Sequence, residues 1–129
     1  MTSRLLLVTV LSLICFACTN SAAKGHKVSI KLSFDADPKC LLDGKKPSED
    51  NLKVKKTYDD DTISWASSCS LTLPKKVSHC VMTGQSVYNP DAISQWSAKA
   101  DGGNIEASMV SEADINPNYG KLEAHYFCH

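Results

Sequence analysis

The chain has 129 residues, of which 43% are hydrophobic and 22% are charged, and this composition is that of one small folded domain. It excludes both a disordered chain and a multidomain enzyme. The 14 basic and 14 acidic side chains balance, and the single arginine, Arg4, lies in the first segment. A domain without arginine lacks the planar fork that grips phosphate or guanine, so specific nucleic-acid recognition is disfavoured.

The start of the chain has the three-part layout of a secretory signal peptide. The charge at Arg4 is followed by an apolar stretch over residues 5–17, and small residues follow at Ser21 and Ala23. We therefore expect residues 1–23 to be a signal peptide that is cleaved after Ala23, and the protein to be secreted.

The apolar run at residues 5–18 is also too short to anchor the chain by spanning a membrane. Its 14 residues fall below the roughly 20 that a spanning helix needs. We expect no transmembrane segment, and one secreted, monomeric domain over residues 24–129. A bacterial lipoprotein anchored at Cys18 is the alternative, because Cys18 precedes Thr19 and Asn20 much as it would at a lipidation site.

Four cysteines lie beyond the signal segment: Cys40, Cys69, Cys80 and Cys128. An even number of cysteines in a small exported domain predicts two disulfides. In the chain-entropy view, each bridge that closes a loop of this size adds about 3 to 4 kcal/mol. That is comparable with the whole net stability of a small domain.

The strand pattern favours one of the three possible pairings. A hairpin around residues 74–76 would point Cys69 and Cys80 to opposite faces, so these two should not pair. A turn shifted by one residue would place them only diagonally, which disulfide geometry tolerates badly. We favour the pairs Cys40–Cys69 and Cys80–Cys128, and the other connectivities stay open.

Alternation of apolar and polar residues predicts strands along most of the domain. The strand segments are 28–34, 52–58, 62–73 with a break at 67–68, 77–83, 105–109 and 122–128. A loop tied down by Cys40 fills residues 35–50, and another loop covers residues 115–118.

One helix is expected between these strands, over residues 90–101. Asn89 can cap it, Pro90 suits its first position, and Ile93, Trp96 and Ala100 fall on one face, with Trp96 as the core anchor. The resulting order, β-β-β-β-α-β-β, predicts an α+β fold: an antiparallel sheet of about five to six strands with one helix packed on it, held by two disulfides.

Polar residues on the closing strand could form a catalytic set. Lys121, Glu123 and His125 alternate on one face, and with His79 they would supply the acid, base and cation that a secreted ribonuclease needs. The alternative is that they form the solvated face that any half-buried sheet displays.

The aromatic residues suggest a second kind of site. Trp65 could stack on a sugar of a cell-wall glycan, and an exposed position on its strand would favour that role.

No metal or other cofactor is expected. His79, Cys80 and the His125–His129 segment resemble zinc ligands in residue type but not in spacing, and disulfides would consume the cysteines. The Asp59–Asp61 run lacks the spacing and closing glutamate of a calcium loop, and is typical of a solvated turn.

Lysine pairs mark the first half of the domain, at residues 45–46, 55–56 and 75–76. They could attract an acidic partner or a membrane surface. They could equally be a solvated face, or could guard sheet edges against unwanted pairing.

About 50 residues that include Cys80, the segment 89–93 and the stretch from Gly120 to Cys128 resemble small cysteine-rich effectors secreted by filamentous fungi. The likeness is to killer-toxin-like and necrosis-inducing-factor domains, which place a cysteine before a helix and end in a strand closed by a cysteine. The chain lacks an opening Cys-Gly element and a second cysteine beside Cys128. The resemblance implies the fold of these domains and the role of a secreted effector, and it assigns no catalytic residue.

The leading hypothesis is a secreted, non-enzymatic effector or toxin-like protein that binds a host or competitor protein or a cell-wall component. It rests on the export signal, the small size, the paired cysteines and the lack of a strong catalytic motif. A secreted ribonuclease using Glu123 and His125 is the second hypothesis. A glycan-binding module using Trp65 is the third.

Overall fold

The computed structural model describes residues 24–112 and 120–129. The expected signal peptide, Cys18 and the loop at 115–118 lie outside the described residues. Within them the chain forms eight strands and two short 3-10 helices. They are β1 (His26–Ser33), β2 (Lys39–Leu42), η1 (Glu49–Asn51), β3 (Leu52–Asp59), β4 (Ser64–Thr72), β5 (Cys80–Tyr88), η2 (Pro90–Ala92), β6 (Ile93–Asp101), β7 (Asn104–Glu112) and β8 (Lys121–Cys128).

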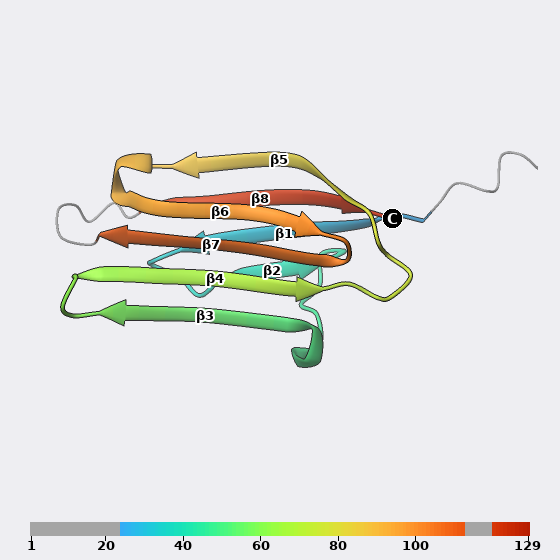
Figure 1. The fold of residues 1–129 in the computed structure, drawn as a ribbon, viewed down its shortest axis with the longest axis horizontal. Coiled ribbons are helices and arrows are strands. Elements are labelled where there is room, and N and C mark those ends of the chain that lie inside the picture. Colours follow the sequence, from blue (N-terminus) through green and yellow to red (C-terminus); the bar gives the residue numbers. More distant parts are fainter. Residues whose placement is uncertain (1–23, 113–119) are drawn as a thin grey trace, which may run out of the picture.

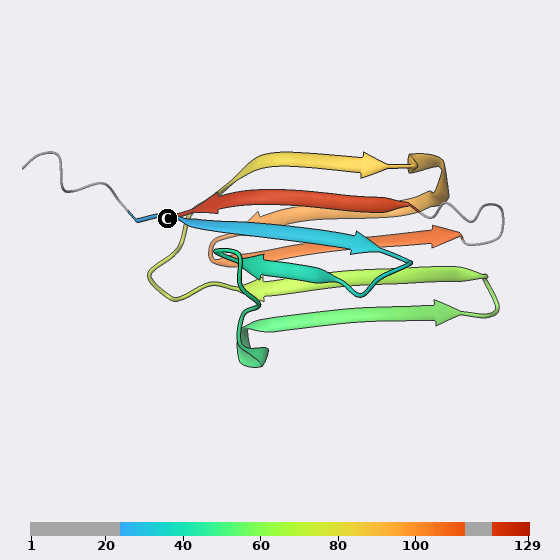
Figure 2. The same ribbon diagram turned by 180° about the vertical axis from the view of Figure 1, so that it is seen from behind.

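The α+β prediction is wrong, because the fold is nearly all β. The strands form two four-stranded antiparallel sheets, in the orders β2-β1-β8-β5 and β3-β4-β7-β6. Figures 1 and 2 show the sheets face to face and offset, so that β3 projects beyond one margin and β5 beyond the other. Neither sheet carries a packed helix among the described residues. No helix in that part of the chain is long and apolar enough to cross a bilayer.

The segment expected to be a helix is strand β6. Asn89 has left-handed backbone dihedrals (φ 52°) and makes no side-chain cap, so only the single turn η2 forms after it. From Ile93 onward the chain pairs with β7, which directs Ala98 and Ala100 inward. Trp96 is 46% exposed and is not the core anchor that helical spacing predicted. Sheet pairing has overridden a local helix signal.

The strands also differ from the expected ones in other places, and the strand expected at residues 77–83 is β5, which begins at Cys80 and continues to Tyr88. Residues 39–42, expected in a loop, form β2 because they pair with β1. Strand β4 is unbroken, and Ser67 is buried opposite Met109. The expected hairpin around residues 74–76 is absent, because β4 and β5 belong to different sheets.

The core lies between the sheets and comes from alternate residues of the inner strands, which is the packing that alternation predicts. The buried apolar residues are Val28, Ile30, Leu32, Phe34, Cys40, Cys69, Leu71, Leu73, Val77, Ile105, Ala107, Met109, Leu122, Ala124, Tyr126 and Cys128.

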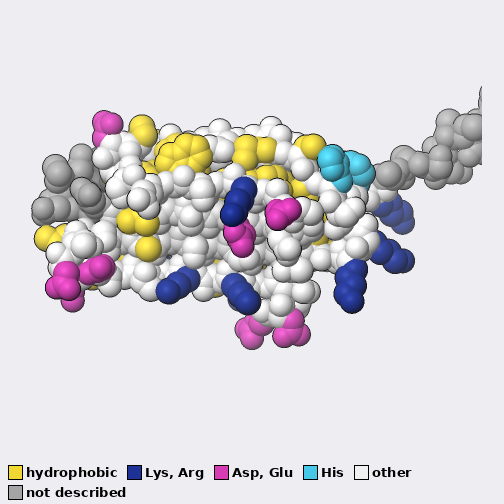
Figure 3. All heavy atoms as spheres, in the orientation of Figure 1, with side chains coloured by type: hydrophobic (Ala, Val, Ile, Leu, Met, Phe, Trp, Pro, Cys, Tyr) yellow, Lys and Arg dark blue, Asp and Glu magenta, His cyan; other side chains and the backbone are white. Residues whose placement is uncertain are grey.

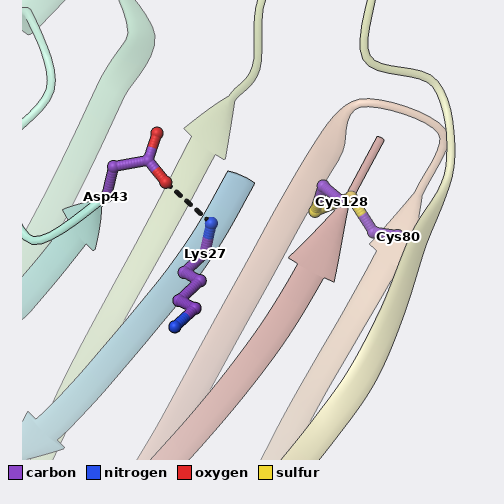
Figure 4. The surroundings of a disulfide bond; sticks show 4 residues. All are labelled: Lys27, Asp43, Cys80 and Cys128. Carbon is purple, nitrogen blue, oxygen red and sulfur yellow. Dashed lines mark hydrogen bonds between the residues drawn. A yellow bond between two sulfur atoms is a disulfide. The ribbon is translucent and has the colours of Figure 1, made fainter. Parts of the chain in front are cut away.

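Two disulfides join the strands, in the pairs favoured from the sequence. Cys40–Cys69 connects β2 to β4 and therefore links the two sheets. Cys80–Cys128 connects β5 to β8, where the two residues are direct cross-strand partners (Figure 4). The hairpin argument for this connectivity fails, but its conclusion that Cys69 and Cys80 do not pair agrees with the structure.

Candidate functional site

The offset of the sheets leaves the inner face of β3 partly uncovered. Strand β2 is short, and the strand of the opposite sheet that it contacts most is β4, not β3. Four residues of β3 face inward: Leu52, Val54, Lys56 and Tyr58. Their partners on β4 are, in the same order, Leu71, Cys69, Ser67 and Trp65. Val54 is 48% exposed and Tyr58 is 43% exposed, although both occupy core-facing positions. We call this surface, made of Leu52, Val54, Lys56, Tyr58 and Trp65, the β3 ledge.

An aromatic pair forms one end of the β3 ledge. The ring centroids of Tyr58 and Trp65 lie 4.5 Å apart with the planes tilted by 42°. The Lys56 Nζ lies 5.7 Å from the centroid of the Trp65 ring, within range of a cation–π contact. Trp65 is half-buried and points to the inner side of β4, so it lacks the exposed outer position that would favour a glycan-binding role. Part of its surroundings is still open, because its neighbour Tyr58 is exposed.

A groove runs between β2 and the β3 ledge, with a volume of about 470 Å³. That volume is in the range of small-ligand sites. The groove combines an apolar floor with four lysines and a single acid. Its lining residues are Asp37, Pro38, Lys39, Cys40, Leu41, Lys46, Leu52, Val54, Lys55 and Lys56.

Acidic residues stand at both ends of β3. Glu49 and Asp50 precede the strand in η1, and the Asp59–Asp61 run begins at its last residue. The Asp59 carboxylate accepts hydrogen bonds from the backbone N–H of Asp61 (2.9 Å) and of Thr62 (3.4 Å), as in an ordinary Asx turn. Figure 3 shows lysines between two acidic groups along the lower margin of the molecule. The basic stretch of β3 is therefore bounded at both ends.

The structure brings Glu123 and His125 together on the outer face of the other sheet. Glu123 Oε1 accepts a hydrogen bond from His125 Nε2 at 2.7 Å, and Lys31 Nζ lies 3.6 Å from the same oxygen. The hydrogen bond from His125 holds the pKa of Glu123 below its ordinary value, and the charge of Lys31 acts in the same direction against partial desolvation.

The other members of the expected catalytic set make other contacts. The ring of His79 meets that of His129 edge-on, with centroids 5.2 Å apart. Lys121 pairs with Asp35, whose carboxylate lies 3.7 Å from its Nζ. The cation beside Glu123 is Lys31, which sequence reasoning did not single out. Its register on β1, directly opposite Glu123, is a long-range pairing that local patterns do not reveal.

The hydrogen-bonded pair of Glu123 and His125 is poorly arranged for acid–base catalysis of RNA cleavage. Glu123 and His125 share one hydrogen bond on a single strand, whereas cleavage of RNA needs an acid and a base on opposite sides of the reacting phosphate. The arrangement is well suited to fix the side chain of His125. Among the described residues, no group of three or more His, Cys, Asp or Glu side chains is placed to hold a metal ion.

No protein-family model matches the chain, and no curated protein matches it. A solved structure to which the chain is similar is the envelope protein VP37 of white spot syndrome virus. It is 14% identical, with a TM-score of 0.44, and the likeness covers 84% of this chain and 97% of that chain. At this level the likeness carries no conclusion about function. The helix that formed part of the resemblance to fungal effectors is strand β6 here.

Proposed function

We propose that this protein is a secreted, non-enzymatic effector or toxin-like protein that binds an acidic host or competitor molecule in the groove beside the β3 ledge. The observation that carries the proposal is the composition of that groove. Four lysines surround an apolar floor at which Val54 is about half exposed, and Asp37 is the single acid. Export is supported by the layout of the first segment and by the two disulfides.

The chemistry of the groove favours an acidic ligand with apolar groups. Lysine side chains lay their methylene stems on apolar surface and keep the ammonium group in water. A ligand that is both acidic and apolar gains from both parts, whereas a purely apolar ligand would have to desolvate lysines. The lysines would also speed the encounter with an acidic partner at low salt.

The test uses the purified, oxidised protein and two acidic probes, immobilised poly-glutamate and heparin, with chitin, glucan and cellulose as neutral controls. We expect retention on an acidic probe that falls as salt rises. Lys46→Glu with Lys55→Glu should weaken binding by about tenfold or more, a change of ~1.4 kcal/mol. These two lysines are exposed and line the groove.

The matched control is Lys75→Glu with Lys76→Glu. It makes the same change in net charge at exposed lysines that do not line the groove. Equal losses in the two variants would mean that only overall charge matters, and would contradict a site at the groove. Retention on neutral glycans that is lost in Trp65→Ala would support the glycan-binding alternative instead.

A ribonuclease is the second candidate, and the observation that favours it is that a carboxylate, an imidazole and the cation of Lys31 meet at Glu123 Oε1. Purified protein is incubated with RNA beside the variants His125→Ala and His79→Ala. Cleavage lost in the first variant and kept in the second would support catalysis at this pair. Absence of cleavage at every pH from weakly acid to neutral would remove this candidate.

A further inference from the structure

We propose that the acidic ligand is a short extended peptide that adds to the free edge of β3 as a fifth strand of its sheet. This inference rests on the proposed function, because it takes the groove beside the β3 ledge as the binding site. It specifies the class of ligand, the backbone that recognises it and the order of its side chains.

Strand β3 is the edge best suited to accept another strand. It ends the order β3-β4-β7-β6, and among the residues that the structure describes no strand lies beyond it (Figures 1 and 2). Its eight residues pair with β4 in unbroken register. An exposed edge of this kind presents unpaired backbone N–H and C=O groups, which are the basis of recognition by strand addition.

The other edges carry features that discourage pairing. Strand β2 has only four residues. Strand β5 shifts register between Met82 and Gly84, and β6 shifts between Ile93 and Gln95. Short strands and bulges are ordinary means of blunting an edge. On β3 the feature that discourages pairing is the set of lysine side chains, whose charges repel one another across a pair of identical edges. An acidic partner is attracted by the same charges.

The two faces of β3 specify alternate residues of the peptide. Lys53 and Lys55 occupy outward-facing positions of β3, because their neighbours in register are Ser70 and Ser68. At this open edge of the sheet Lys55 also lines the groove. Leu52 and Val54 point to the groove. Successive residues of an added strand also alternate between faces. The peptide should therefore carry acidic side chains at every second position, beside the two lysines, and apolar side chains between them.

The acids at the ends of β3 favour a short ligand over a long polyanion. The strand spans about 26 Å at the usual rise per residue. A long anionic chain that follows β3 would meet Glu49 and Asp50 at one end and Asp59 to Asp61 at the other. These acidic side chains repel the parts of an anionic ligand that extend past either end of β3. A ligand about as long as the strand therefore fits best.

The experiment compares probes that separate backbone pairing from charge. The first is an eight-residue peptide of alternating glutamate and valine, matched to the length of β3. The second is the same peptide with N-methyl groups on alternate amides, made in both phases. The third has the same composition, with the glutamates in one block and the valines in another, and the fourth is heparin. Affinity is measured by titration of the oxidised protein and of Lys53→Glu with Lys55→Glu, with Lys75→Glu and Lys76→Glu as the charge-matched control.

We expect the alternating peptide to bind most tightly. One phase of N-methylation should weaken it by about tenfold or more, because the methyl groups then face β3 and block its edge. The Lys53→Glu and Lys55→Glu changes should have an effect of similar size, and the control a smaller one. Replacing Asp60 and Asp61 by lysine should improve binding of a peptide extended past that end. Asp59, which forms the turn, is left unchanged.

Each contrary result has a distinct meaning. If both N-methylated phases bind as well as the parent, or if the block peptide does, strand addition is overturned while the acidic ligand of the groove stands. If heparin binds and no peptide does, the ligand is an anionic glycan, and again only strand addition is overturned. If no acidic probe binds, both this inference and the proposed function are overturned.

Discussion

Val54 and Cys69 are direct partners across the β3–β4 pair, yet Val54 is 48% exposed and Cys69 is 2% exposed. Both side chains point to the same side of the sheet. The difference arises because the opposite sheet covers β4 and stops short of β3. A core-facing position has thus become a surface position, and the β3 ledge follows from this offset.

The exposure of Val54 predicts a small effect on folding. Val54→Thr should change the free energy of unfolding by about 0.5 kcal/mol or less. Ile105→Ala removes a fully buried side chain from β7 and should cost about 2 to 5 kcal/mol. Denaturant unfolding of both variants measures the difference. Comparable costs would show that the ledge is covered in solution.

Each disulfide should make a separate contribution to stability. Cys40 and Cys69 are 29 residues apart, and Cys80 and Cys128 are 48 residues apart. The chain-entropy relation gives about 3.6 kcal/mol for the first bridge and ~4 kcal/mol for the second. The two paired Cys→Ala variants should lose these amounts in denaturant unfolding. A loss of unfolding free energy below about 1 kcal/mol in either variant would contradict the view that the bridge stabilises the fold by restricting the unfolded chain.

The contact between Asp43 and the start of β1 predicts a dependence on pH. Asp43 accepts hydrogen bonds from His26 Nδ1 at 2.7 Å and from the backbone N–H of Lys27 at 2.9 Å, the second drawn in Figure 4. The bond from His26, followed by that from Lys27, lowers the pKa of Asp43 below its ordinary value. A lowered folded-state pKa stabilises the fold above the unfolded pKa, and this contribution is lost as pH falls through the folded pKa.

Because the Asp43 side chain is 48% exposed, solvent screening limits this contribution to about 0.5 to 1 kcal/mol. Asp43→Asn keeps the left-handed backbone at φ 51°, which asparagine tolerates, and removes the charge. The free energy of unfolding of the variant should fall less steeply than that of the parent protein below about pH 4. Parallel acid limbs would refute the role assigned to Asp43.

Gly103, in the β6–β7 turn, lies against the backbone of the β4–β5 connection. A Cβ at this position would lie 2.7 Å from the carbonyl oxygen of Val77. Gly103→Ala should therefore cost about 1 to 3 kcal/mol, because a backbone atom has to move. Its neighbour Gly102 has φ +57° and open space around it, so Gly102→Asn is the control and should change stability much less. Thermal unfolding of the two variants distinguishes these outcomes.

The strands with strict alternation were predictable from the sequence, as β1 and β8 show. The sequence alone does not exclude a helix over residues 90–101. Ile93, Trp96 and Ala100 have the spacing of one helical face, and Trp96, Ala98 and Ala100 have the alternation of a strand. Pairing with β7 decides between them, and that contact is not local. The short strand β2 forms for the same reason, since residues 39–42 become a strand only beside β1.

Some residues of the candidate site were predictable from the sequence, but their arrangement was not. The Lys55–Lys56 pair and Trp65 could be singled out from residue type and position. The β3 ledge could not, because it depends on how far one sheet is displaced over the other. Likewise, Glu123 and His125 are two positions apart and were expected to converge, whereas Lys31 reaches them through the β1–β8 register.

Backbone amide signals, followed during titration with the alternating glutamate–valine peptide, show directly whether the peptide adds to the edge of β3. We expect the largest shifts and the strongest new protection from hydrogen exchange along residues 52–59 of β3, and little change along β6 at the other edge of the same sheet. Changes centred on His125 and Lys31 of the opposite sheet, or no change along β3 at saturating peptide, would contradict binding of the peptide at β3.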